Sequence, residues 1–415
     1  MYSLVIDIIK VIVIASAVLT LIPVLIWWER KGAAYIQDRR GPNRANIFGI
    51  RLGGLIHNIA DVFKLLFKED IIPQQAHKLI YLIAPIIVMG VAVSTLAVIP
   101  FTAPVKLGDF VIKMQIADLN VGIIYILAIA SLGVYGVILA GWSSNNVYSL
   151  FGGLRSSAQM ISYEVAMGLA LLSVIMSSGT VRLDEIAALQ GINILEWNFI
   201  RQPLAFILFL TCLFAETNRN PFDLPEGESE LVAGYHTEYS SMKFALFFMA
   251  EYAHIIVGSM ILVSLFFGGW QIPFLSTEFM HDNMNALLKL ALPVVSVSSI
   301  AAGVLLMRRT KKFGWGDARD FEPLVFGLPA VIFGFIIGIA AVFSIYLNEY
   351  AVSIITAAAQ GAFFLVKTLF FCWFFIWVRW TLPRFRYDQL MKLGWQIMVP
   401  LALINIIITG IVISR

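Results

Sequence analysis

Seven carboxylates lie in a stretch flanked by apolar runs that are long enough to cross a lipid bilayer. They are Glu216, Asp223, Glu226, Glu228, Glu230, Glu238 and Glu251. A carboxylate close to hydrocarbon is costly unless it is paired, hydrated or protonated. The stretch therefore predicts a pathway for protons or ions, and it is the first candidate for a functional site.

Two of these acids are expected to lie one helical turn apart. Pro221 and Pro225 break the preceding helix, and Pro225 can be the first residue of a new one because its missing N–H would be unpaired there. Glu226 and Glu230 then share a face, and their repulsion favours a proton held on one of them. The alternative is a solvated helix start in which the helix dipole favours the acids and Arg219 is the nearest counter-charge.

Three further ionisable groups are expected inside apolar helices. Glu251 lies one turn before His254, and the two side chains could relay protons or satisfy each other as a buried pair. Glu164 lies near the end of another apolar run, and its side chain is too short to snorkel far, which favours a protonatable role. Lys367 lies deep in a third run and would lose its proton unless a carboxylate faced it, so it is a candidate partner for the acids.

The amino-acid composition indicates that these residues belong to an integral membrane protein. Hydrophobic residues make up 60% of the 415 residues and the mean hydropathy is +0.85, whereas soluble domains contain roughly 45 to 50% apolar residues. The net charge of +3 is small and the basic residues lie in short loops, which argues against a nucleic-acid partner. Cys212 and Cys372 are too few for a zinc or iron–sulfur site, so we expect no metal on this chain.

Ten apolar runs have roughly the ~20 residues that a membrane-spanning helix needs. They cover approximately 5–28, 79–101, 119–141, 158–178, 200–215, 244–268, 286–307, 324–347, 353–378 and 395–413. No strand-like alternation persists, so we predict an all-α, polytopic helical bundle that forms a single membrane domain over 1–415.

Positive charges lie mainly in one set of alternate loops. The opposite set contains little beyond Lys106, Lys113, Arg182 and Arg415. By the positive-inside rule, this asymmetry predicts that the basic loops are cytoplasmic and that both termini lie on the outer, periplasmic face. It also agrees with an even number of spans.

A shorter element is expected within the first basic loop. Apolar residues recur there at the spacing of an amphipathic helix, namely Leu52, Leu55, Ile56, Ile59, Val62, Phe63 and Leu66. A helix of this kind lies along the membrane surface, and Pro73 marks its end. It is either an ordinary interfacial anchor or a wall of a lateral opening for a lipid-soluble substrate.

Motifs spread in order over nearly the whole chain point to a known family. They are Glu29 to Lys31, Gln37 to Arg44, Ala60 to Asp70, Gly141 to Asn146, Ser162 to Glu164, Asn220 to Glu226, Glu230 to Ser240, Phe267 to Trp270 and Arg384 to Gln389. Together they resemble the quinone-site membrane subunit of respiratory complex I. This family comprises the H-type subunit of bacterial NADH-quinone oxidoreductase and its mitochondrial counterpart, NADH dehydrogenase subunit 1.

The resemblance implies a subunit that joins a membrane arm to a peripheral arm and forms the lower part and the entrance of a quinone chamber. Quinone is then the substrate, and NADH, FMN and iron–sulfur clusters belong to partner subunits. Other partners would be small membrane subunits, antiporter-like subunits and membrane lipids, in a bacterial inner membrane. The chain would not be catalytic alone.

The resemblance also implies roles for particular residues. Arg30, Arg39, Arg44 and Asp61 would line or brace the chamber. Eight acids would form a water-connected series that couples quinone reduction to proton pumping: Glu164, Glu216, Asp223, Glu226, Glu228, Glu230, Glu238 and Glu251. His254 lies outside the pattern of the family.

The chain also departs from the family pattern by an expected insertion of two spans over 271–350, which brackets a strongly basic loop. Other functions remain open. A ferredoxin- or hydrogenase-linked relative would share the fold, although the long Arg39 to Arg44 turn and the full acidic stretch favour quinone chemistry over hydrogenase. A stand-alone ion transporter would need an internal inverted repeat, which the sequence does not show. A purely structural scaffold is the remaining alternative.

Overall fold

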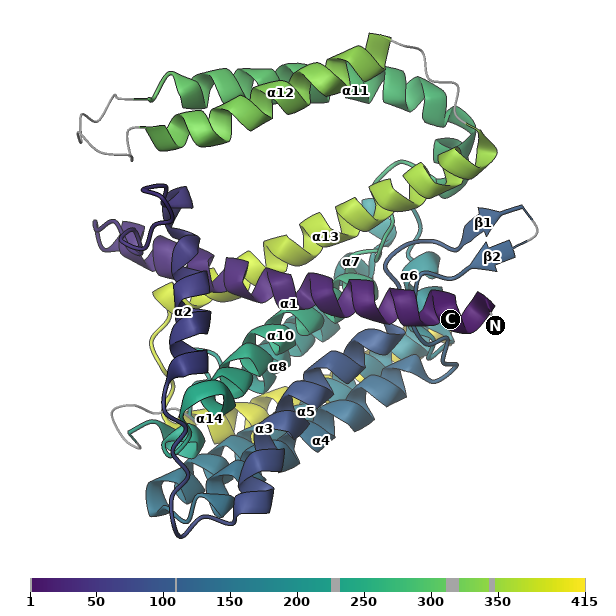
Figure 1. Ribbon diagram of the computed structural model, residues 1–415. Helices are drawn as coiled ribbons and strands as arrows, with labels where there is room; N and C mark the ends of the chain where they lie inside the picture. Colours follow the sequence, from purple (N-terminus) through teal and green to yellow (C-terminus); the bar gives the residue numbers. More distant parts are fainter. Residues whose placement is uncertain (1, 109, 225–231, 311–320, 343–347, 415) are drawn as a thin grey trace.

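The computed structural model describes residues 2–108, 110–224, 232–310, 321–342 and 348–414 (Figure 1). Its α-helices are α1 (Tyr2–Ile36), α2 (Ile56–Phe67), α3 (Lys78–Ser94), α4 (Gly122–Ser143), α5 (Val147–Ser178), α6 (Leu183–Leu189), α7 (Asn198–Arg201), α8 (Pro203–Glu216), α10 (Ser241–Phe266), α11 (Thr277–Met307), α12 (Glu322–Val342), α13 (Glu349–Thr381), α14 (Tyr387–Lys392) and α15 (Val399–Ile413). The short turns of other helix types are η1 (Leu52–Gly54), η2 (Thr95–Val98), η3 (Ile194–Glu196), η4 (Gly234–His236) and η6 (Leu393–Met398), and the strands β1 (Val105–Leu107) and β2 (Phe110–Ile112) form one antiparallel hairpin.

The apolar runs become membrane-length helices, and the chain is an integral membrane protein. Among the described residues, eight helices are long and apolar enough to span a bilayer. Two shorter apolar helices, Pro203–Glu216 and Pro323–Ile339, coincide with the fifth and eighth predicted runs. The prediction of an all-α polytopic bundle is confirmed. The β1–β2 hairpin was not predicted, because strands of three residues are too short to show an alternating pattern.

Helix α10 forms the centre of the bundle and packs against α3, α8 and α13. All its residues from Ile255 to Phe266 are buried. Small residues allow neighbouring helices to approach closely, as in other membrane bundles. A Cβ atom on Gly136 of α4 would lie 2.5 Å from Cγ2 of Val88 on α3, so this contact needs a glycine.

Helix α2 runs across the end of the bundle that lies opposite the two termini (Figure 1). It begins at Ile56, later than the apolar pattern predicted. Leu52, Gly53 and Gly54 have φ angles of 47°, 62° and 97°, which lie outside the helical region, so they form a turn instead. The side chains of Ile59 and Phe63 are exposed on α2, as expected for a helix that rests on lipid.

Helices α11 and α12 form a hairpin that stands apart from the rest of the bundle, at the top of Figure 1. The two helices pack through small residues: Oγ of Ser296 donates a hydrogen bond to the Gly334 carbonyl at 2.8 Å, and Oγ of Ser299 donates to the Ala330 carbonyl at 2.7 Å. The base of the hairpin is attached to α13, where Nε2 of Gln360 donates to Oγ1 of Thr277 at 2.8 Å. This hairpin lies within the segment predicted as an insertion.

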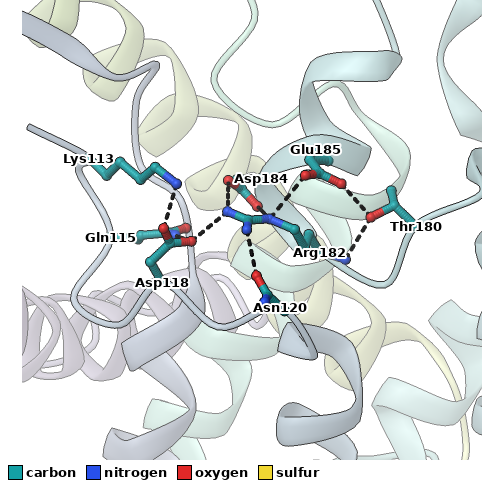
Figure 2. A network of polar contacts seen from close by, with 8 residues as sticks. All are labelled: Lys113, Gln115, Asp118, Asn120, Thr180, Arg182, Asp184 and Glu185. Carbon is teal, nitrogen blue, oxygen red and sulfur yellow. Dashed lines mark hydrogen bonds and ion pairs between the residues drawn. The ribbon is translucent and has the colours of Figure 1, made fainter. Parts of the chain in front are cut away.

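A polar network ties together two loops at the face of the bundle where both termini lie (Figure 2). Arg182, just before α6, contacts Oδ1 of Asp118 at 2.5 Å and Oδ1 of Asn120 at 2.7 Å. The same guanidinium also pairs with Asp184 and Glu185. The loop between α3 and α4 is thereby joined to the loop between α5 and α6.

We expect low pH to weaken this connection between the two loops. The hydrogen bond from Lys113, with the charges of Lys113 and Arg182, holds the pKa of Asp118 below its usual value. The stabilisation from a carboxylate of this kind is complete above its unfolded pKa of about 3.9 and is lost as the pH falls through the lower folded value. The protection factors of the 113–121 amides against hydrogen exchange should therefore fall below about pH 4. Asp118→Asn should show these lower protection factors already at pH 7, and unchanged protection in that variant would contradict the prediction.

Candidate functional site

A cavity of about 700 Å³ opens at the end of the bundle opposite the termini. The last turns of α1, the loop that follows α1, helix α2, the turn after α8 and the end of α13 form its wall. Its lining residues are Glu29, Arg30, Ala33, Arg39, Gly41, Pro42, Asn43, Arg44, His57, Asn220, Arg379 and Trp380. Arg30, Arg39 and Arg44, the arginines predicted for a chamber, all line this one cavity. Asp61 forms an ion pair with Arg30 at its edge.

The loop after α1 is held against the cavity by backbone contacts. The backbone N–H groups of Arg44 and Ala45 both donate to Nε2 of His57, at 2.9 and 3.0 Å. Gly41 has a φ of +65°, and a Cβ atom there would lie 2.8 Å from the Cβ of Ala34. A glycine is therefore needed for the loop to fold back on α1. This conformation presents Arg39 and Arg44 on the same wall as Arg30.

A buried cluster of charges lies beside the cavity. Arg219 is only 3% exposed, and its guanidinium pairs with Glu251 at 2.8 Å and with Glu29 at 3.4 Å. Arg379 from α13 also pairs with Glu29, and the hydroxyl of Tyr252 donates to Oε2 of Glu29 at 2.9 Å. Residues far apart in sequence thus form one network that reaches from the cavity wall into α10.

Glu29, Arg379 and Tyr252 were not singled out from the sequence as site residues. A signal was present, because Glu29 directly follows the first apolar run and belongs to a family motif. Its partners were hidden because they lie roughly 190 to 350 residues away along the chain.

Two other predicted acids are held outside the helices. Oδ2 of Asp223 accepts a hydrogen bond from Arg384 at 2.7 Å, and Oε1 of Glu238 accepts one from the Asn146 amide at 2.6 Å. Burial lowers the pKa of the neighbouring His236 to about 4, although the charge of Asp223 acts in the opposite direction. That ring is therefore neutral at pH 7. The predicted acids Glu226, Glu228 and Glu230 lie outside the described residues.

Glu164 and Glu216 share a small cavity inside the bundle. It has a volume of about 10 Å³ and lies between α4, α5 and α8, with Cys212 as a further lining residue. Glu216 also lines a second cavity of about 30 Å³, which His254 and Thr217 share. A space of 10 to 15 Å³ is roughly what one water molecule needs, so the smaller cavity has the size for one water between ionisable groups and the larger for about two.

Two predicted pairings are wrong. Glu251 does not pair with His254: its carboxylate binds Arg219, and the His254 ring faces the cavity that contains Glu216. Lys367 does not face an acid either. Its ammonium donates to the backbone carbonyls of Phe267, Gly269 and Gln271, each at 2.8 Å. These carbonyls follow the end of α10, where the helix dipole also favours a positive charge.

No metal site is evident in the part of the chain that the structure describes, where no three His, Cys, Asp or Glu side chains come together as ligands. Cys212 and Cys372 are free and buried.

The comparison with known families decides the identity. The sequence model described as NADH dehydrogenase matches residues 9–410. The chain belongs to this family. The resemblance predicted from the motifs is therefore confirmed over almost the whole length of the chain.

Relatives within the NADH dehydrogenase family are similar from end to end. An H-type subunit of the NADH-quinone oxidoreductase of Solibacter usitatus is 42% identical, over 99% of this chain and 97% of the relative. "NADH-quinone oxidoreductase subunit 8" of Rhodothermus marinus is 41% identical, over 96% of this chain and 94% of the relative. An H-type subunit of the NADH-quinone oxidoreductase of Geobacter sulfurreducens is 41% identical, over 98% and 94%.

Proposed function

We propose that the chain is the quinone-site membrane subunit of a proton-translocating NADH:quinone oxidoreductase. It forms the entry and lower part of the quinone chamber and the start of the carboxylate path for proton coupling, and it is inactive alone. Family membership over residues 9–410 supports the complex. The observation that best supports a quinone site is that the arginines expected for a chamber line one cavity of about 700 Å³.

The cavity has the size and charge for the head group of a quinone. Cavities that bind small molecules have volumes of roughly 300 to 1,000 Å³. Arg30, Arg39, Arg44 and Arg379 line it, with Glu29 as the acid among them. Guanidinium groups stabilise the negative charge that develops on quinone oxygens during reduction. Peripheral-arm subunits that carry NADH, FMN and iron–sulfur clusters would bring the electrons to the open side of this cavity.

Quinone reduction would be coupled to proton transfer by a series of acids, the first of which lies at the cavity wall. Two-electron reduction of a quinone away from water creates a species that demands two protons, and its field shifts protonation along nearby carboxylates. Glu29 and Glu251 meet at Arg219, and Glu216 and Glu164 lie further along the bundle. The path would continue to antiporter-like subunits.

The membrane is proposed to be a bacterial inner membrane, with both termini on the outer face and membrane lipids around the bundle. The basic loops at the opposite end, including Arg39, Arg40 and Arg44, support this orientation. The names of the relatives favour NADH over ferredoxin or hydrogen as the source of electrons.

Glu216→Gln tests the proposal in the assembled complex. We expect quinone reduction to continue while the number of protons pumped per quinone falls, because glutamine has a similar shape but cannot carry the proton. Glu278→Gln on α11 is the matched control. Glu278 lies in the first turn of that helix and lines neither of the two cavities that Glu216 lines, so its change should leave the ratio unchanged. Proton uptake in membrane vesicles and NADH oxidation should be measured together. Wild-type coupling in Glu216→Gln would refute the carboxylate path.

A further inference from the structure

A small cavity of about 30 Å³ lies among α4, α5, α8 and α10, away from the large cavity. Most of its lining is apolar. The polar side chains among its lining residues are Thr95, Glu216, Thr217 and His254. Glu216 ends α8 and His254 lies in the second third of α10, so two neighbouring helices bring an acid and a base to one space.

Glu216 and His254 differ from Glu251, the neighbouring acid on α10. Within the described part of the chain, neither makes a hydrogen bond or ion pair with a protein group, whereas Glu251, one turn before His254, binds Arg219. A buried ionisable group without a protein partner is costly unless water or a proton satisfies it. A cavity of this size has room for about two water molecules, and its carboxyl, imidazole and hydroxyl groups supply the partners that a buried water needs.

We propose that Glu216 and His254 exchange a proton through water held in this cavity. This rests on the proposed proton-coupling role of Glu216. In the forward step, the O–H bond of the Glu216 carboxylic acid breaks and an N–H bond forms on the His254 ring, with the water passing on one proton as it receives another. The products are a carboxylate and an imidazolium, and the reverse step restores both neutral groups.

Through this exchange, a proton from the acid series can reach a group on α10 without passing through Glu251. Glu164 approaches Glu216 from α5 at the smaller cavity, which Tyr163 and Cys212 also line. No other titratable residue lines the cavity of about 30 Å³ in the described part of the chain. His254 thus ends a series that runs from Glu164 through Glu216.

The test uses the whole complex in membrane vesicles, with His254→Asn and His254→Leu as variants. Asparagine keeps a polar side chain that can hold the water, but it cannot take up a proton. His281→Asn is the matched control, because His281 lies on α11 against Ser353 and does not line this cavity. Assembly on native gels and NADH oxidation with an artificial acceptor check that each complex is intact.

We expect both His254 variants to lower the rate of coupled proton transfer by roughly a hundredfold, the lower end of what a positioned proton-transfer group contributes. A histidine ring infrared band that changes during quinone reduction should disappear in His254→Asn. A merely structural role would let asparagine restore coupling while leucine did not.

Glu216→Gln, measured in parallel, separates the two proposals. If Glu216→Gln is uncoupled and His254→Asn behaves as wild type, the exchange is wrong and the carboxylate path stands. If Glu216→Gln is fully coupled, the path itself fails, and the exchange fails with it. Loss of coupling in both variants, with the infrared band absent, supports the exchange.

Discussion

Arg219→Met is expected to destabilise the protein by about 3 to 5 kcal/mol, the usual cost of removing one partner from a buried ion pair. Arg219 is 3% exposed and its guanidinium lies between two carboxylates, those of Glu29 and Glu251. Methionine fills similar space but removes the charge that both acids share, and it also removes the cation from the face of the Tyr252 ring, 4.2 Å away. The temperature at which the assembled complex unfolds and loses activity measures the effect.

Arg201→Met is the control for this prediction. Arg201 pairs with Glu196 at 3.9 Å, and both side chains are about half exposed. An exposed pair of this kind contributes about 0 to 1 kcal/mol, so its loss should barely change the unfolding temperature. Equal unfolding temperatures for the two variants would show that the cluster around Arg219 is not a structural centre. Adding Glu251→Leu to Arg219→Met should recover part of the lost stability, because it removes one of the two acids whose charge Arg219 balances.

Ala33→Phe is expected to lower kcat/KM for quinone by roughly tenfold or more, which corresponds to about 1.4 kcal/mol of lost transition-state binding. Ala33 lies on the wall of the large cavity in the last turns of α1, and a phenyl ring there would occupy the space proposed for the quinone head group. NADH oxidation by an artificial acceptor that does not use the cavity should stay unchanged. The measurement is a titration of quinone reduction against quinone concentration.

Ala17→Phe on the same helix is the control, because Ala17 is exposed on the surface of α1. It adds the same ring without changing the cavity. Normal quinone kinetics in both variants would exclude this cavity as the quinone site. A loss shared equally by both variants would point to a general effect on α1 and would also contradict the proposal.

The membrane bundle could be predicted because about 20 apolar residues in a row are a strong local signal. Helix ends and short elements were predicted less accurately. Leu52 was placed in a helix by its spacing, whereas its positive φ puts it in a turn. Periodicity records which side of a helix is apolar, but it does not record where glycines let the backbone turn.

The motifs pointed to residues that lie together in the structure, but they did not reveal which residues contact one another. Arg30, Arg39 and Arg44 follow family motifs, and they do meet at one cavity. The pairing of Glu251 with His254 failed because spacing along a helix does not reveal that Arg219, on another segment, approaches Glu251 from outside α10. The partners of Lys367 could not be found in the sequence, because backbone carbonyls are present at every residue.

The contacts of Lys367 have a mechanical consequence for the α11–α12 hairpin. The chain leaves the main bundle just after Gln271, whose carbonyl Lys367 binds, and it returns in α13, the helix that carries Lys367. Gln360 on the same helix donates a hydrogen bond to Thr277 at the start of α11. Both ends of the hairpin are therefore attached to one helix, α13. A lateral force from the bilayer on the hairpin would act on these contacts before it reached the arginine-lined cavity at the other end of α13.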